Sequence, residues 1–215
     1  MKRLKIPYCA DLNSNELSSI VSILADKGAS DMIEQVNWKK QFPYKPLTEF
    51  SVLRNDTSLL VRFFVRGNML KAVYSKDQSP VYQDSCVEFY CKVPTSEYYY
   101  NFEFNCIGAC SASRRKSRTE DVQRLNEQEM LSIKRFSSIG RKAFQEMQGM
   151  FEWELTIEIP LQLIGVDSAN LPTHLMANFY KCADDTVSPH YVSWSPIQTD
   201  VPDFHRPEFF AMLEF

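Results

Sequence analysis

Two glutamates, Glu88 and Glu103, and the nearby Asn105 interrupt a strongly apolar stretch of the chain at residues 80–105. Carboxylates and amides bind sugar hydroxyls, and a carboxylate pair can hold a metal ion, share a proton or act as the acid and base of a glycosidase. Like charges inside a hydrophobic hairpin are destabilising unless something compensates them. The three residues therefore indicate a site, with an arginine, a metal ion, a shared proton or a polar ligand as the compensating partner.

Two strands must position these residues. Strict two-residue alternation predicts antiparallel strands on either side of a loop at Pro94–Glu97. The apolar faces must coincide, because a slip of one residue would place a glutamate against a phenylalanine. The register that meets this condition pairs Cys86 with Asn105, Val87 with Phe104, Glu88 with Glu103, and Phe89 with Phe102. The two carboxylates would then be direct neighbours, with Cβ atoms about 5 Å apart.

Composition limits the class of protein. The chain has 215 residues, of which 44% are hydrophobic, enough for one substantial core. Its 15 Phe and 10 Tyr favour strands over helices. A net charge of -3 provides no basic field for nucleic acid. The basic run at residues 114–118 precedes Glu120 and Asp121, which is typical of a solvated loop.

Localisation is predicted from the absence of targeting signals. No apolar run approaches the roughly 18 residues of a membrane span. The basic N-terminus reaches Pro7 and Asp11 before an apolar region forms, so we predict no signal peptide. We expect a cytoplasmic protein as the sequence stands, with no membrane partner, or a secreted or periplasmic one if a signal was removed.

The pattern along the chain predicts an all-β fold. A helix is expected at residues 14–27, capped by Ser14 and ended by Gly28, and a weaker one at Thr119–Leu131, capped by Thr119. Besides the hairpin, strands are expected near residues 48–52, 59–65, 69–74, 151–159, 175–182 and 209–215. We predict an antiparallel β-sandwich of jelly-roll or immunoglobulin type, formed by residues 48–215. Residues 1–47 would form the N-terminal helix and an extended linker packed on it.

Cysteines and histidines form no recognisable motif. Six cysteines lack a C-x-x-C pair, which predicts reduced, packed thiols and argues against a structural zinc site. Cys86 and Cys91 should lie on opposite faces of one strand. The three histidines are scattered, without the spacing of a metal site or a catalytic triad. We therefore predict no metal ligands and no catalytic residues.

Two aromatic residues, Tyr82 and Trp194, lie at the ends of predicted strands. An aromatic ring there can present its flat face to the C–H face of a sugar. Ordinary packing at the edge of a sheet would explain the same positions, so the residues alone leave both interpretations open.

The order of several motifs resembles carbohydrate-binding module family 9. The hairpin is similar to that family's W-x-D-S-V-E-F and Y-x-F-E-x-N strands, with Tyr82 in place of the usual tryptophan. Further similar segments are WELTIEIP from Trp153, NFYK from Asn178, SWSP from Ser193 and PEFF from Pro207. The match runs from about Phe50 to Phe215.

The resemblance implies a DOMON-like β-sandwich that binds glucan or xylan-type sugars without catalysis and serves polysaccharide catabolism. Tyr82 and Trp194 would stack on the sugar, and Glu88, Glu103 and Asn105 would bind its hydroxyls. Calcium occurs in the family, but no residue here localises it, and no other cofactor is implied. The oligomeric state is left open.

Two alternatives remain. The two glutamates could be a glycosidase pair, since retaining enzymes hold their carboxyls about 5–5.5 Å apart and inverting ones about 6.5–9.5 Å. The chain could also be a protein-interaction sandwich in which Arg62, Arg114 or Arg115 balances the acids.

Overall fold

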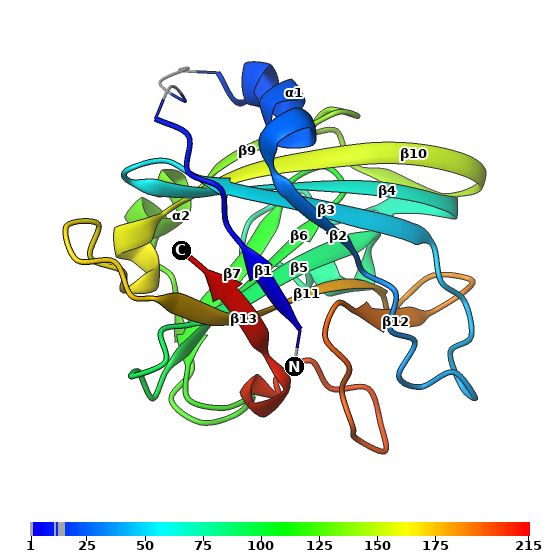
Figure 1. The fold of residues 1–215 in the computed structure, drawn as a ribbon. Helices are drawn as coiled ribbons and strands as arrows, with labels where there is room; N and C mark the ends of the chain where they lie inside the picture. The colour runs from blue at the N-terminus through cyan, green and yellow to red at the C-terminus, as the bar shows by residue number, and fades with distance from the viewer. Residues whose placement is uncertain (1, 11, 13–15) are drawn as a thin grey trace.

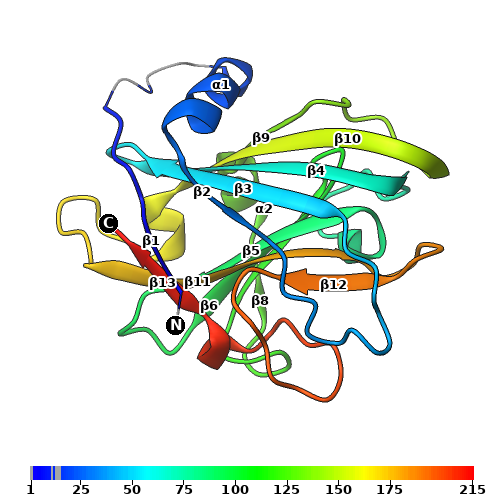
Figure 2. The same ribbon diagram turned by 45° about the vertical axis from the view of Figure 1, so that its right-hand side comes forward.

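Two sheets packed face to face make up the computed structural model, which describes residues 2–10, 12 and 16–215 (Figures 1 and 2). The larger sheet contains, in spatial order, β1 (Arg3–Lys5), β13 (Ala211–Glu214), β11 (His174–Ala183), β5 (Cys86–Lys92), β6 (Tyr99–Asn105), β7 (Cys110–Arg115) and β8 (Gln123–Arg124), with β12 (His190–Ser193) also paired to β11. The smaller sheet contains β2 (Ala29–Met32), β3 (Leu47–Arg54), β4 (Ser58–Ala72), β10 (Phe144–Pro160) and β9 (Lys134–Ser137). The predicted β-sandwich is confirmed.

Neighbouring strands are antiparallel except β1 and β13, which run in parallel near the two ends of the chain. The first 47 residues contribute strands to both sheets, because β1 joins the larger sheet and β2 joins the smaller. The strands predicted at 59–65 and 69–74 form one long strand, β4, which pairs along most of its length with β10. The register of β10 against β4 shifts twice, between Phe144 and Met147 and between Gln148 and Phe151. The second shift lies opposite residues 67–69 of β4, where the sequence pattern separated the two predicted strands.

Apolar side chains from the inner faces form the core between the sheets. Phe179 of β11 stacks on Phe50 of β3 with ring centroids 3.7 Å apart, and on Phe89 of β5 at 4.9 Å. These aromatic contacts join the two sheets. They are possible because alternation along β5 and β11 directs every second side chain into the core between the sheets.

The outer face of the larger sheet is buried as well. The segment that connects β12 to β13 folds back across this face, and Phe204 of that segment stacks on Tyr180 of β11 at 4.2 Å. Trp38 and Tyr90 belong to the same second apolar cluster. The side chains of β5 and β6 that point away from the inner core are therefore buried under this segment.

Short helices lie outside the sandwich. The first, α1 (Leu17–Lys27), packs Leu17, Ile20 and Leu24 on the outer face of the smaller sheet (Figure 1). It ends at Gly28 as predicted, whereas the predicted cap, Ser14, lies outside the described residues. Among the described residues, none of the helices is long and apolar enough to cross a membrane.

The second helix, α2 (Glu127–Ser132), begins later than predicted. Its cap is Asn126 rather than Thr119, because Asn126 and Glu129 form a reciprocal capping box. Three 3-10 turns complete the fold, at η1 (Val81–Gln83), η2 (Leu161–Ile164) and η3 (Pro207–Phe209). The last of these occupies the start of the strand expected at 209–215, so β13 begins only at Ala211.

We expect Phe179→Ala to lower the free energy of unfolding by about 3–5 kcal/mol, since it leaves a cavity between the two sheets. Urea unfolding followed by tryptophan fluorescence measures the change. Phe136→Ala is the matched control, because the Phe136 side chain on β9 is 38% exposed. Equal losses for the two variants would contradict the role assigned to the stacked core rings.

Candidate functional site

The predicted register of the central hairpin is confirmed. Glu88 of β5 pairs directly with Glu103 of β6, and their neighbours Phe89 and Phe102 form the next pair. Because the phenylalanines belong to the inner core, the glutamates project from the outer face of the larger sheet. They are nevertheless only 2% and 7% exposed, since the covering segment lies over them.

The two carboxyls lie at a cavity of about 320 Å³ between the larger sheet and its cover. Side chains of β5, β6, β7 and β11 line its sheet side, and residues of β8, β12, η1 and the loops line the rest. The lining residues used below are Tyr82, Glu88, Tyr90, Glu103, Arg115, Arg118, Cys182, Asp184, Tyr191, Phe204 and His205. Acidic, basic and aromatic groups therefore meet in one enclosure, although they come from distant parts of the chain.

Hydrogen bonds hold the two carboxyls in place. Glu103 Oε1 accepts from Tyr90 Oη at 3.2 Å and from Asn101 Nδ2 at 2.9 Å. Glu88 Oε1 accepts from the Cys182 thiol at 3.0 Å. Glu88 Oε2 is buried and has no hydrogen-bond partner. The Glu88 carboxyl thus keeps an unused acceptor beside the cavity.

No arginine or lysine forms an ion pair with Glu88 or Glu103 within the described part of the chain. Arg62 instead pairs with Glu154 of the smaller sheet, with Nη2 and Oε1 2.6 Å apart. Arg114 lies over the Tyr98 ring at 3.8 Å. Arg62 and Arg114 therefore do not balance the acids, because both guanidinium groups are engaged elsewhere. Arg115, the third arginine considered, lines the cavity, and its positive charge lowers the pKa of Glu103 without forming an ion pair with it.

Burial changes the pKa values of the two glutamates. Loss of solvent raises the pKa of Glu88, and the neighbouring charge of Glu103 raises it further. Burial also raises the pKa of Glu103, against the lowering effect of its bond from Tyr90. Both carboxyls therefore keep their protons to higher pH than exposed glutamates do. A protonated carboxyl donates as well as accepts, which suits a ligand rich in hydroxyl groups.

Other ionisable groups of the cavity are shifted by the same cause. Burial raises the pKa of Asp184 to about 6. Burial lowers the pKa of His205 to about 3, and the positive charges of Arg115 and Arg118 act in the same direction. The His205 ring is thus neutral at ordinary pH, and its Nδ1 lies 3.0 Å from Tyr99 Oη.

The structure brings together three of the five residues predicted for the site. Tyr82, on the turn η1 that precedes β5, lines the cavity with a ring that is 38% exposed. Glu88 and Glu103 line it from the adjoining strands.

Trp194 lies elsewhere, which corrects the expectation that it stacks on a sugar together with Tyr82. Its ring is fully buried in the inner core, where it meets Phe50 and Phe179 edge-on. The indole Nε1 donates to Asp31 Oδ2 at 2.7 Å. This ring faces the inner core rather than the cavity, because Trp194 follows β12 directly and lies two residues after the inward-facing Val192.

Asn105 also differs from expectation. Its amide Nδ2 donates to Asp84 Oδ2 at 2.9 Å, and its Oδ1 accepts from Ala109 N at 3.0 Å. Asp84 in turn accepts from the backbone N–H groups of Val73 and Tyr74. The amide therefore ties β6 to the following turn and to the start of β5, and it does not line the cavity.

Sequence reasoning missed several cavity residues. Tyr90 shares a strand face with Glu88, so the two-residue period was a sufficient signal for it. Tyr191 and His205 had no such signal, because a hairpin and a covering loop bring them to the cavity. The histidine was predicted to lie in a loop without a role.

Six free thiols agree with the prediction of reduced, packed cysteines. Cys91 belongs to the inner core and Cys86 to the outer cluster, as the alternation required. Among the described residues, one cluster of three His, Cys, Asp or Glu side chains has ligand atoms close enough to share a metal: Cys86, Glu88 and Cys182. Two sulfurs do not suit calcium, which takes oxygen ligands, so calcium has no supported site here.

Comparison with known proteins supports the sequence resemblance. The model of the family described as carbohydrate-binding family 9 matches residues 20–215. No curated protein matches the chain.

Solved structures share the fold. A "putative carbohydrate-binding protein" from Bacteroides uniformis ATCC 8492 is 32% identical, with a TM-score of 0.92 over 100% of this chain and 99% of its own. A carbohydrate-binding module family 9 domain from Caldicellulosiruptor kristjanssonii in complex with glucose is 12% identical, with a TM-score of 0.61 over 99% of this chain and 95% of its own. Its complex with cellotriose has a TM-score of 0.60 at 12% identity, covering 99% and 93% of the two chains. The last two show a shared fold only.

The buried His205 should make stability depend on pH. An unfolded histidine takes up a proton as the pH falls through about 6.5, whereas folded His205 stays neutral until about pH 3. The stabilisation is therefore present above about pH 6.5 and is lost below it. Between pH 7 and pH 5 we expect wild type to lose about 2 kcal/mol more free energy of unfolding than His205→Gln does.

Urea unfolding at the two pH values measures this difference. His174→Gln is the control, because His174 lies outside the cavity and bonds only its neighbour Thr173. If His205→Gln and wild type lost stability in parallel, the neutral state assigned to His205 would be wrong.

Proposed function

Because this chain belongs to carbohydrate-binding family 9, we propose that its acidic cavity binds a sugar or short oligosaccharide of glucan or xylan type. The observation that carries the proposal is the Glu88–Glu103 pair, which is buried at the cavity and forms no ion pair with the residues that the structure describes. A polar ligand would supply the hydrogen bonds that the pair lacks. A role in polysaccharide catabolism would follow from such a ligand.

The chemistry of the lining supports this proposal. Glu88 Oε2 would accept from a sugar hydroxyl, since it has no partner within the protein. Protonated glutamates would also donate to hydroxyl oxygens. Tyr82 would pack its ring on the C–H face of the sugar, and Tyr191 offers a second aromatic surface in place of Trp194. Asp184 and Arg115 would complete the polar contacts.

The size of the cavity favours a small ligand. A volume of about 320 Å³ is at the lower end of the range of small-molecule sites. We therefore propose that a single sugar unit or a short oligosaccharide enters, rather than the middle of a polysaccharide chain that would need an open groove.

We expect Tyr82→Ala to weaken sugar binding by about tenfold, which corresponds to the loss of about 1.4 kcal/mol from one aromatic contact. Isothermal titration calorimetry with glucose, xylose, cello-oligosaccharides and xylo-oligosaccharides gives the affinities. The control is Tyr8→Ala, because the Tyr8 ring is 50% exposed and lies outside the cavity. Absence of heat with every sugar and wild-type protein would reject the proposal.

We propose that binding occurs without catalysis. A glycosidase needs one protonated carboxyl and one ionised carboxyl on opposite sides of the scissile bond. Here burial raises the pKa of both glutamates, and both project from one sheet face. Two carboxyls on one sheet face cannot flank a scissile bond from opposite sides.

We therefore expect no turnover of nitrophenyl glucosides or xylosides, assayed by release of nitrophenol. Turnover that Glu88→Gln abolishes, while Tyr8→Ala retains it, would instead establish the glycosidase alternative.

A further inference from the structure

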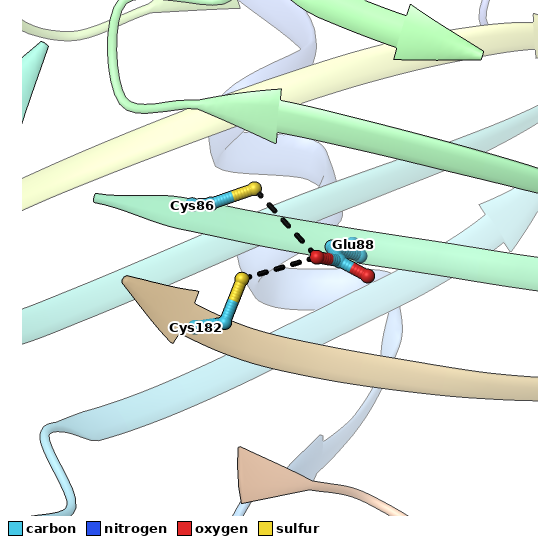
Figure 3. Close-up of side chains that lie close together, drawn as sticks. All are labelled: Cys86, Glu88 and Cys182. Atoms are coloured by element: carbon cyan, nitrogen blue, oxygen red, sulfur yellow. Dashed lines mark hydrogen bonds between the residues drawn. The ribbon is translucent and has the colours of Figure 1, made fainter. Parts of the chain in front are cut away.

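Two cysteines from different strands meet beside Glu88. Cys86 of β5 lies directly opposite Cys182 of β11 in the larger sheet. The Cys182 sulfur lies 3.0 Å from Glu88 Oε1, and the Cys86 sulfur lies 3.9 Å from the same oxygen. Figure 3 shows both thiols directed toward this carboxyl oxygen. The two sulfurs and the oxygen all lie within 4.8 Å of one another.

We propose that Cys86, Glu88 and Cys182 form a three-ligand site for Zn²⁺ beside the cavity. Zn²⁺ binds cysteine sulfur at about 2.3 Å and carboxylate oxygen at about 2.0–2.2 Å, so ligand atoms around one ion are only a few ångströms apart. The three atoms already have that spacing. Two sulfurs favour a thiophilic ion and exclude Mg²⁺ and Ca²⁺, which prefer oxygen ligands.

The surroundings of Glu88 leave room for a ligand and give it access. Glu88 Oε2, the second oxygen of the same carboxyl, is buried and has no hydrogen-bond partner among the described residues. Glu88 and Cys182 also line the cavity, whereas Cys86 lies fully buried behind them. An ion could therefore reach the cluster from the cavity, and water would complete its coordination from that side.

Binding requires a balanced exchange of protons. Each S–H bond breaks as a sulfur–zinc bond forms, and the two protons leave to the solvent through the cavity. Glu88 binds as a carboxylate and also releases its proton if it holds one. Two thiolates, one carboxylate and one Zn²⁺ leave a single negative charge. Lys181, whose Nζ donates to the carbonyl of Cys182 at 2.7 Å, interacts electrostatically with Cys86, Glu88 and Cys182 and would offset part of this charge.

The experiment measures metal binding without sugar, so its result is independent of the proposed function. Reduced protein in a phosphine reductant is titrated with Zn²⁺ against a chromophoric chelator, and separately with Co²⁺. We expect one Zn²⁺ per chain, and near-ultraviolet thiolate-to-cobalt charge-transfer bands with Co²⁺. Cys182→Ser and Glu88→Gln should each weaken Zn²⁺ binding by at least about 100-fold, because even outer-shell partners are worth about 10–100-fold.

The matched control is Cys91→Ser. Cys91 is a buried thiol on the same strand but on its inner face, so Zn²⁺ affinity should be unchanged if the folded state is retained. Thermal unfolding of each variant checks folding, and Glu88→Gln carries the test if a cysteine variant fails to fold. Equal Zn²⁺ affinity of wild type and Glu88→Gln, or Co²⁺ binding without charge-transfer bands, would overturn the proposal.

Discussion

Burial of the larger sheet on both faces is the constraint on which the rest of this structure depends. A strand exposed on one side would place its alternate residues in water. Here the segment between β12 and β13 covers the outer face, so most residues of β5 and β6 enter one of two buried layers. The inner layer is filled by phenylalanines. The outer layer contains tyrosines, thiols and the two glutamates, which remain close to the sheet under the cover.

This arrangement explains how a carboxyl pair persists inside the protein. Two ionised carboxyls on directly paired residues would repel each other strongly in a medium of low dielectric constant. Burial raises the pKa of both carboxyls, which disfavours two charges side by side, and Tyr90, Asn101 and Cys182 donate hydrogen bonds to them. The remaining acceptor, Glu88 Oε2, has no counterpart in the protein. A buried polar atom without a partner is costly, which makes it a reasonable indicator of a ligand.

Family membership and local geometry contribute different information. The fold is shared with sugar-bound structures at 12% identity, a level at which individual contacts cannot be transferred. The ligand of this cavity therefore depends on the residues that line it in this chain. On that basis Tyr82 remains a wall of the site, while Trp194 belongs to the core that joins the sheets. Cys182 lines the same cavity and pairs with the buried Cys86, so the proposed sugar site and the proposed metal site would share Glu88.

The sequence by itself determined the hairpin, including the pairing of Glu88 with Glu103. Two-residue alternation and a short loop leave only one register that keeps apolar residues together, and this information is local. The tertiary structure alone decided what surrounds that pair. The burial of Trp194, the arrival of His205 and the approach of Cys182 to Cys86 depend on contacts between segments far apart in the chain. The periodicity of a single segment cannot predict such contacts, because they form only when the two sheets and the covering segment pack together.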